Sequence, residues 1–403
     1  MKVFLGAFGD PAHAFPMLAL GARLAARGHD VTFETWERWR PDVERSGLQF
    51  VPAPEYPVFP TADHPIKPYQ AVVLATPQTR GAITAAAPDV VVHDILTVAP
   101  ALAAELEGVP VATLIPHVYP APQAGLPPYA LGARPPRTPF GRAFWRALER
   151  PLEQGFERGR AELNETRARL GLAPLKRIHG GISERLALVA TFPQLEYPRH
   201  WWPNTHVVGP LAWEPPYHDV APPPGSDPLV LVAPSTAHDS DHRLVRCALT
   251  GLAREPVRVL ATTNRRQAAG EAQLVPIPVP ANGRLVEWIS YSRSMPGCEL
   301  VITHAGHGTL VRALASGCAV VAVPHSGDMA ENAARADWAG VGVRLPWRVL
   351  SPATLRLAVR RALENPRLAA RAAELRQWAA ANDGATRAAE LVEQLGGGIQ
   401  TDR

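Results

Sequence analysis

The chain has 403 residues, which suggests two domains of about 200 residues each rather than one core. A formal charge of +4 is too small and too dispersed for a nucleic-acid footprint, and no apolar run approaches the ~20 residues of a membrane span. The cysteines, Cys247, Cys298 and Cys318, lie far apart and lack metal-ligand spacing. We therefore expect a soluble, cytoplasmic protein with no nucleic-acid partner.

The first predicted unit is a strand, a loop and a helix. Residues 2–8 form an apolar run that breaks at Gly9-Asp10-Pro11, and a helical pattern follows from Phe15 to Arg27. The next predicted strand is 31–33. Residues 6–11 do not form the G-x-G-x-x-G fingerprint of dinucleotide-binding domains. The sequence therefore does not favour a nicotinamide-dependent dehydrogenase.

A later apolar run, residues 88–94, predicts a parallel strand that ends at Asp94. Open α/β sheets bind ligands at the carboxyl ends of their strands, so Asp94 is a candidate site residue, although an aspartate there is also an ordinary helix cap. His13 follows the first strand at the same predicted edge, where it is either a site residue or a polar loop residue. His93 should point to the opposite side of the strand from Asp94, and we interpret it as structural.

An amphipathic segment follows in the first half of the chain. Apolar residues recur every four positions, with arginines on a neighbouring row: Phe140, Phe144, Leu148, Leu152 and Phe156, with Arg142, Arg146 and Arg150. Such a helix can lie on a membrane surface, or it can pack on its domain and rim a cleft. We favour packing, because Pro151 interrupts the stripe and glutamates share the basic faces.

Prolines between residues 213 and 228 predict a linker, and a second alternating series of strands and helices begins after it. We predict domains at 1–212 and 229–380, with a helical tail at 381–403. Two βαβ series predict an α/β fold of two facing Rossmann-like domains, with parallel sheets and an interdomain cleft. The predicted strands from the end of the first half onward are 186–190, 206–210, 228–232, 257–262, 284–289, 300–302, 319–323 and 341–345.

The most informative stretch is Glu299 to Trp338. An apolar strand, 300–302, breaks into His304-Ala305-Gly306-His307-Gly308-Thr309 before a helical pattern begins. The glycines let backbone N–H groups approach a ligand at the positive end of that helix, which is typical of a phosphate site. The next strand leads to Pro324–Asn332, so that polar groups converge on one crevice: His304, Thr309, Asp328, Glu331 and Asn332.

Several motifs are missing from the sequence. It contains no G-x-x-x-x-G-K phosphate loop, no H-E-x-x-H and no G-x-S-x-G, which disfavours P-loop ATPases, zinc proteases and α/β-hydrolases. Asp239-Ser240-Asp241 imitates a metal-binding D-x-D, but it precedes a predicted amphipathic helix, where Asp and Ser are ordinary caps. We expect no bound metal.

The stretch from His304 to Thr309, followed by Pro324, Gly327-Asp328 and Glu331-Asn332, resembles the donor site of GT-B nucleotide-sugar-dependent glycosyltransferases. The resemblance is greatest to the bacterial natural-product group related to plant enzymes, and it spans nearly the whole chain. It implies an acceptor-binding first domain, a nucleotide-sugar-binding second domain and a last helix that packs back on the first domain. The donor residues that it implies are Thr236, Trp288, His304, Gly306, Gly308, Thr309, Asp328, Met329, Glu331 and Asn332.

The resemblance also implies a mechanism. Gly9 to Pro16 is similar to the family segment that holds the catalytic base, which makes His13 the base and Asp94 the carboxylate that orients it. We expect inverting transfer from a UDP- or dTDP-sugar to a small, largely apolar hydroxylated acceptor such as a polyketide or flavonoid, by a monomer or homodimer. We expect no cofactor, no required metal and no membrane association.

The sequence departs from the family pattern in ways that affect the donor. Met329 stands where many relatives have glutamine, which leaves the sugar open, and Ile289-Ser290-Tyr291 departs from the common segment after Trp288. Arg312 stands where plant members carry a glutamate that holds the ribose hydroxyls. Three alternatives stay open: a sugar-nucleotide epimerase of the same fold, a membrane-surface glycosyltransferase with a lipid acceptor, and a non-catalytic sugar-nucleotide sensor.

Overall fold

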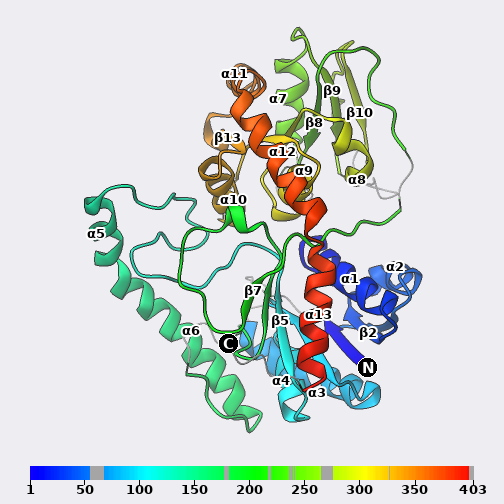
Figure 1. Cartoon of the computed structure of the whole chain (residues 1–403), viewed down its shortest axis with the longest axis vertical. Coiled ribbons are helices and arrows are strands. Elements are labelled where there is room, and N and C mark those ends of the chain that lie inside the picture. The colour runs from blue at the N-terminus through cyan, green and yellow to red at the C-terminus, as the bar shows by residue number, and fades with distance from the viewer. Residues whose placement is uncertain are drawn as a thin grey trace.

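The computed structural model describes residues 1–54, 68–176, 181–216, 219–235, 239, 241–264, 276–325 and 327–398 (Figure 1). The described chain forms two separate parallel β-sheets with helices on both faces. This confirms the predicted α/β fold of two Rossmann-like domains. The central strands of both sheets are largely or wholly buried, such as Val90–Asp94 and Leu229–Ala233, as expected where helices cover both faces.

The first sheet has the order β3 (Gln49–Pro52), β2 (Asp30–Thr35), β1 (Lys2–Gly6), β4 (Val90–Asp94), β5 (Val111–Ile115), β6 (Ala187–Val189) and β7 (Thr205–Val207). The helices of this domain are α1 (Pro11–Ala26), α2 (Arg40–Arg45), α3 (Pro68–Ala86), α4 (Ala99–Leu106), α5 (Pro139–Ala147) and α6 (Glu149–Arg169). Because β1 pairs with both β2 and β4, the loops that follow β1 and β4 lie side by side.

The second sheet has the order β10 (Gly283–Val286), β9 (Arg258–Thr262), β8 (Leu229–Ala233), β11 (Leu300–Thr303), β12 (Ala319–Ala322) and β13 (Gly342–Arg344). Its helices are α7 (Arg243–Gly251), α8 (Tyr291–Ser294), α9 (His307–Ala315), α10 (Gly327–Trp338), α11 (Pro352–Leu363) and α12 (Pro366–Ala381). The last helix, α13 (Gly384–Gly396), runs beside α1 in Figure 1. Its Leu391 and Val392 belong to the core of the first domain.

The start of α1 differs from the sequence prediction. The helical pattern predicted a start at Phe15, whereas the helix begins at Pro11. The Asp10 side chain accepts a hydrogen bond from the backbone N–H of Ala12 at 3.0 Å, and proline fits the first position of a helix because its missing N–H is not needed there. His13 therefore lies in the first helical turn rather than in a loop.

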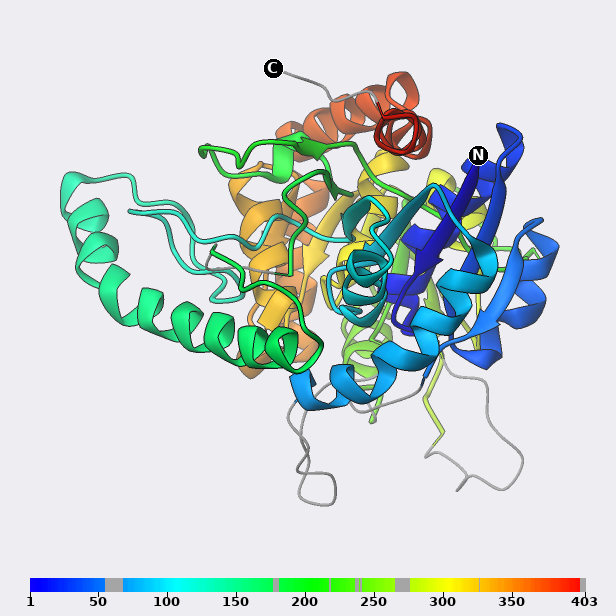
Figure 2. The same ribbon diagram turned by 90° about the horizontal axis from the view of Figure 1, so that it is seen from below.

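The prediction that the amphipathic segment packs on its domain holds only in part, because Leu152 and Phe156 line a cavity with first-domain residues such as Trp202, while the start of the segment is exposed. The segment forms two helices, α5 and α6, which meet at Leu148, and they extend away from both sheets as an arm (Figure 2). The side chain of Phe140 is 83% exposed and that of Phe144 is 50% exposed. The predicted stripe is thus exposed at Phe140 and only half covered at Phe144, whose ring contacts that of Trp145. None of the described helices is long and apolar enough to cross a membrane.

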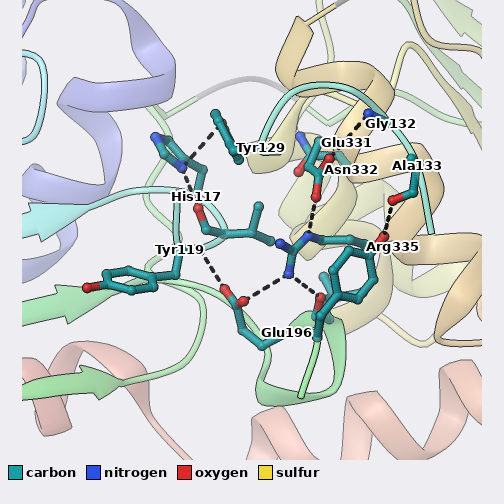
Figure 3. A network of polar contacts seen from close by, with 12 residues as sticks. His117, Tyr119, Tyr129, Gly132, Ala133, Glu196, Glu331, Asn332 and Arg335 are labelled. Carbon is teal, nitrogen blue, oxygen red and sulfur yellow. Dashed lines mark hydrogen bonds and ion pairs between the residues drawn. The ribbon is translucent and has the colours of Figure 1, made fainter. Parts of the chain in front are cut away.

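A buried ion network joins the two domains (Figure 3). The Arg335 guanidinium of α10 donates to Glu196 of the first domain at 2.8 Å and to Glu331 of its own helix at 2.9 Å. Glu196 also accepts from the Tyr119 backbone N–H at 2.6 Å, and Glu331 accepts from the Gly132 N–H at 3.3 Å. The side chains of Arg335, Glu196 and Glu331 are at most 4% exposed. The network therefore fastens α10 to two segments of the first domain.

Removing Arg335 should destabilise the protein strongly, because it leaves two buried carboxylates without their cation. We expect Arg335→Ala to lower the free energy of unfolding by about 3–5 kcal/mol, measured by denaturant titration. A matched control is Arg387→Ala, which breaks an exposed pair with Glu390 at 3.4 Å and should cost less than about 1 kcal/mol. Equal losses in the two variants would contradict this account of the interface.

Candidate active site

A cavity of about 300 Å³ lies between the two domains. Its first-domain wall comes from the start of α1 and the segment after β5, and its second-domain wall comes from the starts of α9 and α10 and the ends of β8 and β10. The linker closes one side. The residues that line it include Asp10, His13, Phe15, Pro16, Pro116, His117, Leu211, Glu214, Ser235, Asn264, Trp288, Tyr291, His304, Gly306, His307, Gly308, Thr309, Arg312, Asp328 and Met329.

His13 and Asp94 meet at the first-domain wall. The Nδ1 atom of His13 lies 2.7 Å from Oδ1 of Asp94, whose side chain is fully buried at the end of β4. Asp94 also accepts a hydrogen bond from the Thr97 hydroxyl at 3.2 Å. An Nδ1–H that donates to Asp94 leaves the lone pair of the His13 ring on Nε2, the tautomer that a general base needs. His93 points to the other face, where its Nε2 contacts the Thr113 hydroxyl at 2.7 Å.

The surroundings of His13 have opposing effects on its pKa. Burial favours the neutral ring and lowers the pKa, but the negative charge of Asp94 and its hydrogen bond favour the imidazolium. Asp10 and Asp328 act in the same direction as Asp94, and the net result is a raised pKa. The ring therefore holds a proton more readily than an ordinary histidine.

A second imidazole, His117, lines the same cavity. Its Nδ1 donates to the Val118 carbonyl at 2.7 Å, and its ring stacks on that of Tyr129 with the centroids 5.3 Å apart. Burial lowers the pKa of His117 to about 3, with smaller contributions from the nearby His13 and His307. His117 was not predicted from the sequence, and the signal that could have revealed it is the apolar run Val111–Ile115 just before it.

The glycine loop lies on the second-domain wall. Gly306 has an ordinary φ of −59°, while the left-handed residue of the loop is Ala305, with φ 66°. Gly306 instead leaves room for the His304 ring, because a Cβ there would lie 2.4 Å from Nε2 of His304. A Cβ at Gly308 would meet nothing within 4 Å. The first N–H groups of α9 have no partners within their own helix, so this edge of the cavity suits an anion.

The predicted donor residues divide into two groups. Trp288, His304, Gly306, Gly308, Thr309, Asp328 and Met329 line the cavity, and Thr236 lies outside the described residues. Glu331 and Asn332 are buried on the inner side of α10 instead. Glu331 belongs to the domain-joining network, while the Asn332 amide donates to the Ala305 carbonyl at 3.0 Å and supports the loop.

The end of the cavity beside Trp288 and the linker contains an ion pair that motif reasoning did not predict. The Arg312 guanidinium of α9 donates to the Glu214 carboxylate of the linker at 2.7 Å, and each side chain is 14% exposed. Nearby, the Asn264 amide donates to the Tyr291 hydroxyl at 2.7 Å and to the Pro234 carbonyl at 2.9 Å. Glu214 could not have been found from the sequence, because no motif marks it.

No metal-binding group of three or more His, Cys, Asp or Glu side chains occurs among the residues that the structure describes. Asp239 is the first residue of the Asp239-Ser240-Asp241 segment that resembles a D-x-D motif. It accepts hydrogen bonds from the backbone N–H groups of Arg243 at 2.7 Å and Leu244 at 3.1 Å. It therefore caps α7, as the sequence indicated.

Residues 259–395 match the family model described as the C-terminal domain of erythromycin biosynthesis protein CIII-like proteins. The chain is 29% identical to 4'-demethylrebeccamycin synthase of Lentzea aerocolonigenes over 98% of this chain and 99% of that protein. It is also 29% identical to O-mycaminosyltylonolide 6-deoxyallosyltransferase of Streptomyces fradiae, over 98% and 97% of the two chains. The solved structure of the glycosyltransferase VinC in complex with dTDP is similar in fold, with a TM-score of 0.70, 19% identity and coverage of 98% and 100%. With the two-sheet fold, these matches show a glycosyltransferase of the GT-B fold that is similar over nearly its whole length to natural-product glycosyltransferases.

Proposed function

We propose that this glycosyltransferase inverts the anomeric carbon as it moves a sugar from a UDP- or dTDP-sugar to a hydroxyl of a small, largely apolar acceptor. The observation that carries the proposal is that His13, held by the buried Asp94, and the start of α9 line one cavity from opposite domains. A base on one side and a leaving-group site on the other suit a single displacement. The sugar would then bond to the acceptor oxygen on the face opposite the departing diphosphate.

The donor would bind on the second-domain wall. The N–H groups at the start of α9 and the Thr309 hydroxyl would hold the diphosphate and stabilise the charge that develops on it, without a required metal ion. Asp328 would accept hydrogen bonds from the sugar hydroxyls, and Trp288 would stack on the nucleobase. The position of all three side chains on the cavity wall supports these roles.

The acceptor would bind beside His13. The first-domain wall is mostly apolar there, with Phe15, Pro16, Pro116 and Leu211 around the imidazole. Burial of apolar surface would supply most of the affinity, and one hydroxyl would point at Nε2 of His13. The relatives named after rebeccamycin and tylonolide also support a small natural-product acceptor such as a polyketide or flavonoid.

Of the two imidazoles, His13 is the better base. A general base works best when its pKa lies near the working pH, and the pKa of His117 of about 3 makes that ring a poor proton acceptor. The pKa of His13 is instead raised, since the charge and hydrogen bond of Asp94, together with the charges of Asp10 and Asp328, outweigh the effect of burial. Asp94 would also stabilise the imidazolium that forms as the acceptor hydroxyl attacks.

Replacing His13 should remove the base and spare donor binding. We expect His13→Ala to slow turnover on an alkyl alcohol acceptor by about 10²–10⁴-fold, the usual worth of a positioned base. The loss should be smaller on an acidic nitrophenol, which ionises without help. Turnover on both acceptors and donor binding by calorimetry would be measured. If His117→Ala lost turnover on the alcohol while His13→Ala kept it, the role of base would pass to His117.

Replacing Asp94 by asparagine should change the pH dependence of the reaction. The active ring is neutral, so kcat/KM should rise with pH through the pKa of His13. Asparagine has no charge to favour the imidazolium, so the midpoint of this rise should move to lower pH than in the wild type. The plateau should also fall by about tenfold or more, because the tautomer is no longer fixed. An unchanged midpoint would remove Asp94 from this role.

The enzyme should discriminate weakly between ribose and deoxyribose donors. Arg312 can only donate hydrogen bonds, and it stands where plant relatives have a ribose-binding glutamate. The dTDP bound to VinC is consistent with a deoxyribose donor in this group. We expect kcat/KM for matched UDP- and dTDP-sugars to differ by less than about a hundredfold. A stronger preference for UDP would contradict the role given to Arg312.

A further inference from the structure

The linker crosses the cavity where the two domains meet, and its residue Trp213 contacts both domains. The Trp213 ring packs edge-on against Phe15, two residues beyond His13 in α1, with the centroids 5.0 Å apart. The Trp213 carbonyl accepts a hydrogen bond from the Arg312 guanidinium of α9. Trp213 therefore connects the linker both to α1, which carries His13, and to α9 on the second-domain wall.

Glu214 is the residue through which the linker holds the donor wall. Its carboxylate accepts hydrogen bonds from the hydroxyls of Ser290 and Ser292. It also accepts from the backbone N–H groups of Tyr291 and Ser292, each at 3.2 Å, and from Arg312 at 2.7 Å. These donors come from α9 and from the start of α8, directly after Trp288. One carboxylate thus ties together two separate segments of the second domain.

Glu214 and Arg312 have different relations to the cavity. The acceptor positions of the Glu214 carboxylate are directed at protein donors, so this side chain is not available to hold ribose hydroxyls. Arg312 lines the cavity with its guanidinium fixed by that carboxylate, at a site only 14% exposed. A charge-assisted pair at such a site is stronger than a surface pair, because little water competes with it.

We propose that Glu214 is a positioning residue for the donor: it holds Arg312 and the 290–292 segment in the arrangement that admits a nucleoside diphosphate. This inference rests on the proposed binding of the donor in this cavity. Glu214 does not touch the reacting atoms, so its loss should weaken nucleotide binding and leave the chemical step in place. The linker would then act as a wall of the donor site as well as a connection between domains.

Glu214→Gln tests this role with little change in shape. The glutamine keeps one oxygen for the serine hydroxyls but loses the charge that holds the Arg312 guanidinium. We expect the Kd for UDP and for dTDP, measured by calorimetry, to rise about tenfold or more. The donor KM should rise in parallel, while kcat at saturating donor stays within about threefold and the pH profile is unchanged. The Kd of the double variant Glu214→Gln/Arg312→Gln for either nucleotide should not exceed that of the single variant with the lower affinity, because the two residues act as a pair.

Asp219→Asn is a matched control, since Asp219 is a linker carboxylate that pairs with Arg293 of α8 at 2.6 Å on the surface. It should leave both Kd values unchanged. The inference is overturned if Glu214→Gln keeps wild-type affinity for both nucleotides. It is also overturned if the loss of binding free energy in the double variant equals the sum of the losses in the two single variants. A wild-type protein that binds neither nucleotide would instead overturn the proposed function, and this inference with it.

Discussion

The arrangement of the site depends on one buried cation, the guanidinium of Arg335. It lies between Glu196 of the first domain and Glu331 of its own helix, and all three side chains are almost fully buried. Such charges are costly to bury, and they are tolerated only when each is paired in good geometry. Only a limited set of domain orientations meets that condition. The network shown in Figure 3 therefore fixes α10 relative to the first domain. Asp328 and Met329, which line the cavity, belong to the same helix.

The cavity divides its tasks between the domains for a topological reason. Parallel strands put their carboxyl ends at one edge of a sheet, so β1 and β4 bring the His13 turn and Asp94 together, while β11 and β12 bring the glycine loop and the start of α10 together. In the proposed mechanism, proton transfer belongs to the first edge and binding of the diphosphate to the second. The linker residues Trp213 and Glu214 join the two edges through contacts with Phe15 and Arg312.

Residues within one motif proved to have different surroundings. Glu331 and Asn332 follow Asp328 closely in the sequence, yet Asp328 lines the cavity while the other two are buried on the inner side of α10. A helix turns about 100° per residue, so positions three or four apart can still face different neighbours once a second domain packs beside it. In the same way, the left-handed residue of the glycine loop is Ala305 and not a glycine, because Thr303 and Asn332 hold its backbone.

The sequence by itself determined the two parallel sheets and placed His13 and Asp94 at the same sheet edge, because these follow from local apolar runs and breaks. The family resemblance supplied most of the residues that line the cavity. Only the tertiary structure decided the contacts between distant segments: Arg335 with Glu196, Arg312 with Glu214, and His117 beside His13. It also decided that Phe140 and Phe144 are exposed on an arm. Periodicity tells which face of a helix is apolar, but what covers that face depends on segments far away in the chain.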